Sequence, residues 1–226
     1  MVFEQPPVYL FGIRINEPVT SITDLLVSAV CFYAFYKLSR IPVKNKVHLN
    51  LRYYFLSMAM ATAIGGIIGH AFMYNFSFYW KLPGWITSMF SIALVERAAI
   101  HYTRTLIHPR LATFFKWANL LELLTFVTLT LLTLNFFYVE VHSAYGLLVV
   151  VSSLNLYVYL KRKTKGSKLF LTAVGFSALS ALVFMNKWGI SVWFNHLDIS
   201  HILMTISAIY FYLGARSILN DPILKN

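Results

Sequence analysis

Apolar residues fall in seven long runs along this chain, with short polar segments between them. The runs are Val19–Leu38, Leu51–Phe72, Pro83–Tyr102, Ala118–Tyr138, Val141–Leu160, Leu169–Met185 and Ile199–Ile218. A helix needs about 20 apolar residues to cross the hydrocarbon core of a bilayer, and each run is close to that length. The pattern therefore predicts an all-α fold, a polytopic membrane protein in which residues 1–226 form a single seven-transmembrane helix bundle.

Composition supports the membrane class. Of the 226 residues, 58% are hydrophobic and only 12% are charged, about half the charged share of a typical soluble domain. The first eighteen residues lack a basic head followed by an apolar run, so we do not expect a cleavable signal peptide. The single cysteine, Cys31, excludes an internal disulfide.

Positive charge is concentrated in alternate loops and accounts for a net charge of +11. One set of loops and flanking turns carries Lys37, Arg40, Lys44, Lys46, Arg52, Arg104, Arg110, Lys116, Lys161, Arg162, Lys163, Lys165, Lys168, Arg216 and Lys225. The other set carries only Arg14, Lys81 and Lys187. The positive-inside rule then places the N-terminus outside and the C-terminus in the cytoplasm. This charge suits anionic lipid headgroups, so we expect membrane lipids and no nucleic acid as partners, in a bacterial inner membrane or an internal eukaryotic membrane.

In this topology two histidine-bearing helix ends share the outer face. The second run ends at His70, and the last helix begins near His196 and contains Asp198 and His201. Ionisable groups at membrane depth are costly and mark functional sites. His70, His201 and Asp198 would supply two imidazoles and one carboxylate, the ligand count of a catalytic zinc site with an open position for water. His196 is a further candidate ligand.

Two carboxylates on the first helix are candidates for catalytic roles. Asp24 and Glu17 are seven residues apart and so lie on one helical face. Either could accept a proton from water or orient a histidine ligand. Glu17 precedes Pro18 at a helix start, so N-terminal capping is the alternative interpretation.

Polar residues elsewhere give two further expectations. Glu140 and His142 open the fifth span, on the same outer side as the histidine motifs. Arg97 and Glu122 lie in the third and fourth spans, and we expect them to form a structural ion pair.

Seven spans, His70 at the end of the second and His201 near the start of the seventh resemble the alkaline ceramidase and adiponectin-receptor superfamily. Lys81-Leu82-Pro83 and Glu17 are similar to short segments of ceramidases. The resemblance implies a zinc-dependent membrane hydrolase, or a receptor built like one, with His70 and His201 as metal ligands.

The chain departs from that pattern at three places. Gly66 stands where the family has a serine, Trp80 or Lys81 where it has an aspartate, and Leu197 where it has the earlier seventh-span histidine. Asp198 or His196 would therefore have to complete the metal site.

Two function classes remain open from the sequence. The first is a zinc-dependent intramembrane hydrolase that cleaves a lipid-like amide or ester. The alternative is a non-enzymatic receptor-like or structural membrane protein, whose histidine and aspartate cluster binds a structural metal or packs helices together. A retinal-binding opsin is excluded, because Ile199–Ile218 contains no lysine.

Overall fold

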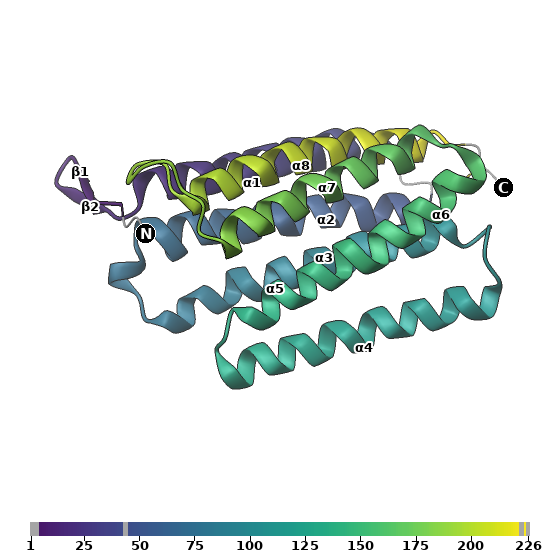
Figure 1. Ribbon diagram of the computed structural model, residues 1–226, viewed down its shortest axis with the longest axis horizontal. Coiled ribbons are helices and arrows are strands. Elements are labelled where there is room, and N and C mark those ends of the chain that lie inside the picture. Colours follow the sequence, from purple (N-terminus) through teal and green to yellow (C-terminus); the bar gives the residue numbers. More distant parts are fainter. Residues whose placement is uncertain (1–4, 43–44, 222–223, 225–226) are drawn as a thin grey trace.

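The computed structural model describes residues 5–42, 45–221 and 224, in which long helices lie side by side in a bundle (Figure 1). The uninterrupted long helices are α1 (Pro18–Ser39), α3 (Leu82–Thr103), α4 (Pro109–Thr133), α7 (Lys165–Met185) and α8 (His196–Leu219). Helix α2 (Lys46–Ile64) continues into the π-helix η1 (Gly65–Ala71). Helix α5 (Phe137–Ala144) continues through the π-helix η4 (Tyr145–Val151) into α6 (Ser152–Arg162). Two short 3-10 helices, η2 (Met73–Asn75) and η3 (Phe78–Lys81), join η1 to α3. Lys44 and Lys225, which belong to the predicted basic loops, lie outside the described residues.

Six helical segments in the described part of the chain are long and apolar enough to cross a membrane. They are Pro18–Ser39, Lys46–Ala71, Pro109–Thr133, Phe137–Arg162, Lys165–Met185 and His196–Leu219. The protein is therefore an all-α, multi-pass integral membrane protein. Helix α3 has 22 residues but contains Glu96 and Arg97, and it is not among the six. The seventh span of the sequence analysis thus depends on α3 and stays a prediction.

Most helix boundaries lie within a few residues of the predicted runs, but those of the fourth were wrong. Helix α4 begins at Pro109, where proline suits a first helical turn, and ends at Thr133 rather than Tyr138. Leu134 adopts the left-handed conformation with φ 53°, and its N–H donates to the Thr130 carbonyl. The side chain of Asn135 accepts a hydrogen bond from the Phe137 N–H at 3.0 Å. The apolar run therefore contains a turn that hydropathy alone does not reveal.

Small residues allow close packing where α7 meets α8. A Cβ added to Gly214 would lie 2.5 Å from the Phe170 ring, so only glycine fits there. Ser177 and Ser207 hydrogen bond at 2.8 Å across the same contact. Small residues and hydroxyl bonds of this kind join helices in membranes, where no hydrophobic force drives helices together. Helix α4 in contrast lies at the edge of the bundle (Figure 1), and most of its side chains are accessible.

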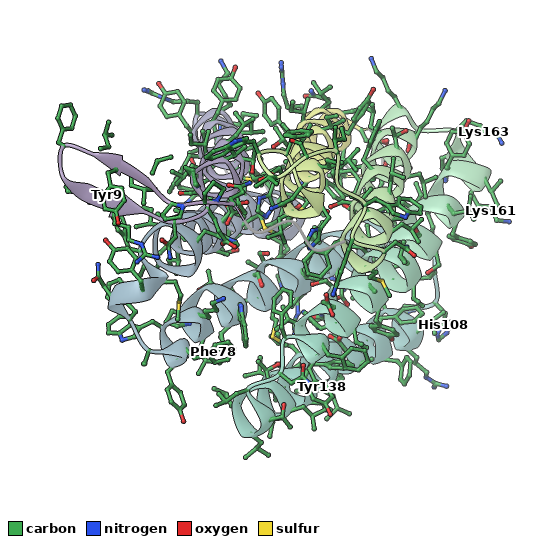
Figure 2. The ribbon with its side chains drawn as sticks, turned by 60° about the vertical axis from the view of Figure 1, so that its left-hand side comes forward. Tyr9, Phe78, His108, Tyr138, Lys161 and Lys163 are labelled. Carbon is green, nitrogen blue, oxygen red and sulfur yellow. The ribbon has the colours of Figure 1, made fainter. Side chains whose placement is uncertain are left out.

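The two ends of the bundle differ in charge. His108, Lys161 and Lys163 lie toward one end, and Tyr9 and Phe78 lie toward the other (Figure 2). The aromatic end also carries the two-stranded hairpin of β1 (Val8–Leu10) and β2 (Ile13–Ile15), which the sequence analysis did not anticipate. Two of the connections predicted to be basic, those after α3 and after α6, therefore lie at one end of the molecule.

Candidate metal centre

Asp24 of α1, His70 of η1 and His201 of α8 come together at the end of the bundle that carries the hairpin. One possible ligand atom from each lies within 4.8 Å of the other two. His201 Nε2 is 3.9 Å from Asp24 Oδ1, and the centroids of the two imidazole rings are 6.0 Å apart. Three helices distant in the sequence thus meet at one cluster of metal-ligating side chains, called the trio below.

The Asp24 carboxylate is buried without a hydrogen-bond donor among the described residues. Its side chain is 8% exposed, and its nearest charged or chargeable neighbour is His201. Gly65 leaves room for it, because a Cβ at that position would lie 2.5 Å from Asp24 Oδ2. A buried carboxylate without compensation is costly, so this group requires a cation or a proton.

Both histidines of the trio are held through Nδ1. Glu17 Oε2 lies 2.6 Å from His70 Nδ1, and Thr23 Oγ1 lies 3.1 Å from His201 Nδ1. Metal-binding histidines are usually oriented by a hydrogen bond to the ring nitrogen that does not bind the metal. This arrangement leaves Nε2 of each ring as the nitrogen for a metal ion.

Glu17 orients His70 rather than capping α1, so the capping interpretation was wrong. Glu17 occupies the N-cap position but makes no side-chain bond to the helix. Its backbone is left-handed, with φ 42° and ψ 54°, a conformation that costs a residue with a side chain about 1 kcal/mol or more. The hydrogen bond with His70 lowers the pKa of Glu17, against the opposing effect of partial burial. The Glu17 carboxylate therefore serves as an acceptor for the His70 ring.

The π-helix η1 explains how His70 reaches this position. Backbone hydrogen bonds in a π-helix join residues five apart, so Gly65 and His70 lie on successive turns, and Gly65 contacts Asp24. The Gly66 carbonyl accepts a hydrogen bond from Ser21 of α1 at 2.8 Å. A Cβ at Gly69 would meet no atom of another described segment within 4 Å, so Gly69 leaves open space beside His70.

Asp198 and His196 lie outside the trio, although the sequence analysis named both as metal ligands. The Asp198 carboxylate is fully buried and accepts hydrogen bonds from Gln5 at 2.8 Å, from Thr20 at 2.8 Å and from the Asn195 N–H at 2.7 Å. With Asn195 it forms a capping box at the start of α8. The ring of His196 packs against Phe184, with centroids 5.8 Å apart. The carboxylate beside His70 and His201 is that of Asp24.

A second cluster joins Glu96 of α3, Glu122 of α4 and His142 of α5, again with one possible ligand atom from each within 4.8 Å. Glu122 Oε1 lies 2.6 Å from His142 Nδ1. The predicted Arg97–Glu122 ion pair was wrong, because Arg97 donates instead to the Asn119 side chain at 2.7 Å.

This second cluster was not predicted from the sequence, which placed His142 on the same outer side as the histidine motifs. A usable signal was present: Glu96, Glu122 and His142 are ionisable residues on three successive helices. Such residues inside apolar runs require partners of their own.

Comparison with known proteins gives one family. Neither a search of curated proteins nor a search of solved structures found a match. One family model, described as a family of unknown function (DUF6962), matches residues 19–220. The match includes every residue of the trio and of the second cluster and extends over nearly the whole bundle, so the chain belongs to this family.

Proposed function

We propose that this protein is a zinc-dependent intramembrane hydrolase, in which Asp24, His70 and His201 bind the metal and water cleaves a lipid-like amide or ester. The observation that carries the proposal is the Asp24 carboxylate, buried, without a hydrogen-bond donor among the described residues and beside two imidazole rings. Asp24 replaces Asp198 of the sequence analysis as the carboxylate ligand, because Asp198 is already saturated by hydrogen bonds.

The donor set fits zinc. Two imidazole nitrogens and one carboxylate oxygen are zinc ligands, and three protein ligands leave a position open in catalytic sites. Zinc bound there would supply a Lewis acid and lower the pKa of a water molecule. Glu17 and Thr23 hold the two rings through Nδ1 and leave each Nε2 for the metal; His201 Nε2 lies 3.9 Å from Asp24 Oδ1.

A lipid-like substrate suits the position of the trio. The side chains of His70 and His201 are 19% and 13% exposed, so the site is close to the surface of the bundle rather than sealed within it. Beside them Gly69 leaves open space. Membrane lipids are the molecules that meet such a surface, and the resemblance to ceramidases suggests an amide or ester bond as the point of attack.

The proposed topology has seven spans, with α3 as the third. It has the N-terminal hairpin outside and the basic end of the bundle in the cytoplasm, in a bacterial inner membrane or an internal eukaryotic membrane. The gathering of basic side chains at one end supports this orientation. The trio then lies near the outer leaflet.

The second candidate is a receptor-like or structural protein that uses the same site without turnover. It is favoured by the hydrogen bonds that His70 donates to Glu17 and His201 donates to Thr23, which already tie α1 and its N-cap residue to η1 and to α8. In that case a metal would stabilise the bundle only.

Elemental analysis of detergent-purified protein tests the site. We expect the His70→Ala/His201→Ala double variant and Asp24→Asn each to contain about one zinc ion per chain fewer than wild type. His108→Asn is the matched control, since it removes a histidine at the other end of the bundle and keeps a good helix cap. A double variant that retains the wild-type metal content would refute the site.

Turnover separates the two candidates. Wild-type protein in vesicles should release the labelled chain of a lipid amide or ester, lose this activity with a chelator and regain it with zinc. The double variant should stay at the background of protein-free vesicles. Zinc bound without any such hydrolysis would favour the receptor-like or structural protein.

A further inference from the structure

The second cluster contains buried carboxylate oxygens that the described residues leave without partners. Glu96 is completely buried, and its Oε1 has no hydrogen-bond partner. Glu122 Oε2 is also buried without a partner. Both oxygens are buried within a membrane protein, where an unsatisfied charged oxygen is especially costly. The two oxygens therefore require a cation or a proton between α3 and α4.

Neighbouring groups hold the other polar atoms of the cluster. Asn119 donates to Glu96 Oε2 at 3.2 Å. His142 Nε2 lies 2.9 Å from the Met89 carbonyl, which can only accept, so Nε2 carries the hydrogen. His142 Nδ1 is then the nitrogen next to Glu122, at 2.6 Å. An outer hydrogen bond to a backbone carbonyl is the usual way to orient a histidine that binds a metal through its other nitrogen.

Arg97, next to Glu96 in the chain, makes its hydrogen bonds away from both carboxylates. The Arg97 guanidinium donates to the Asn119 side-chain oxygen at 2.7 Å and to the Lys116 carbonyl at 3.3 Å. Two carboxylates and a neutral imidazole carry a charge of −2, which one divalent cation would cancel. The ligand set also suits such an ion, since carboxylate oxygens with imidazole bind Mn²⁺, Fe²⁺ and Zn²⁺.

The surroundings leave space beside Glu96. A cavity of about 80 Å³ is lined by Glu96 together with Asn119, Tyr145 and Ser153 among others. Gly146 of η4 makes room for the Glu96 carboxylate itself, because a Cβ there would lie 2.5 Å from Glu96 Oε1. A π-helix thus borders the second cluster as another borders the trio, and such segments are frequent at functional sites.

We propose that Glu96, Glu122 and His142 form a second metal-binding site, separate from the trio, that takes a divalent cation of the Mn²⁺, Fe²⁺ or Zn²⁺ class. The ligand atoms are Glu96 Oε1, an oxygen of Glu122 and His142 Nδ1. The site links α3, α4 and α5. It does not depend on the proposed hydrolysis or on zinc at the trio.

Mn²⁺ binding to metal-stripped, full-length His70→Ala/His201→Ala protein tests this site, because that background removes two ligands of the trio. The loss of the free-ion EPR signal should report about one Mn²⁺ per chain. Adding Glu96→Gln or Glu122→Gln should abolish this binding, since each amide keeps the shape of the side chain but not its charge. Adding Glu140→Gln, on the same helix as His142 but in neither cluster, should leave it unchanged.

Absence of bound Mn²⁺ in the background protein would overturn the proposal and indicate carboxylates that share protons with His142. Binding that survives both glutamine substitutions would overturn it as well. A second measurement needs no variant of the cluster: pulsed EPR of the bound Mn²⁺ should show the nitrogen coupling of one imidazole. Bound Mn²⁺ without that coupling would contradict the role of His142. Neither result depends on whether the trio binds zinc.

Discussion

Gly65 and Asp24 are matched across the contact between η1 and α1. The carboxylate of Asp24 occupies the space that any side chain at position 65 would fill, with 2.5 Å between Oδ2 and an added Cβ. Gly69 lies on the same π-helix and faces open space. Gly65 therefore makes room for a proposed metal ligand, whereas Gly69 makes no such contact.

Gly65→Ala is expected to weaken zinc binding without removing a ligand. The new methyl group would displace the Asp24 carboxylate, and we expect a loss of affinity of about tenfold to a hundredfold, as for other groups that position metal ligands. Zinc affinity measured by competition with a chromogenic chelator would report it. Gly69→Ala is the control and should bind like wild type; an equal loss in both variants would contradict the role assigned to Gly65.

At single residues the sequence predicted part of the site. It placed His70 and His201 on one side of the membrane, and the two rings do lie together. It preferred Asp198 to Asp24, because Asp198 and His201 are three residues apart on one helix. Asp24 lies on a different helix from both histidines, so the sequence alone does not relate it to them. The sequence Asn195-His196-Leu197-Asp198 has the spacing of a capping box, which could have assigned Asp198 to the helix start.

At the scale of elements, hydrophobic runs predicted where helices lie but not how their backbones are bonded. Neither π-helix nor the break at Leu134 changes the pattern of apolar residues, because each alters hydrogen bonding within a continuous run. Packing decides these features. In both π-helices a glycine lies against a buried carboxylate, Gly65 against Asp24 and Gly146 against Glu96.

Replacing two helix glycines by alanine should separate the effect of tight packing on stability from the effect of helix propensity. Gly146→Ala would bring a methyl group into Glu96 and Ile92, and we expect a destabilisation of about 1–3 kcal/mol. Gly175→Ala on α7 meets no atom within 4 Å, and alanine should stabilise the helix by up to about 1 kcal/mol. Thermal unfolding in detergent would measure both. A Gly146→Ala protein as stable as Gly175→Ala would show that the Glu96 environment is not tightly packed.

For the whole molecule, the segregation of charge was predictable, because loop charge follows the topology rather than details of packing. The chain alternates basic and nearly uncharged connections, and these lie at opposite ends of the bundle. The number of spans was harder to predict. Glu96 and Arg97 interrupt the apolar character of α3, and their partners on α4 and α5 are not adjacent in the sequence.

Cysteine labelling would test both the orientation and the count of spans. Cys31 is buried, so Cys31→Ala provides a background for Tyr9→Cys and Lys161→Cys, at opposite ends of the bundle. In intact cells or sealed vesicles a membrane-impermeant maleimide should modify the first position and reach the second only after permeabilisation. The reverse pattern would invert the proposed orientation. Modification of both from the same side would remove α3 from the spans.

The π-helical form of η1 makes the site sensitive to chain length as well as to residue type. Each residue added to or removed from an ordinary α-helix rotates all that follows by about 100°. Loss of one residue between Gly65 and His70 could instead restore α-helical bonding and keep the flanking helix in register, while moving the imidazole away from Asp24. Relatives in this family that retain Asp24, His70 and His201 but have a one-residue gap in this turn should therefore lack the proposed metal centre.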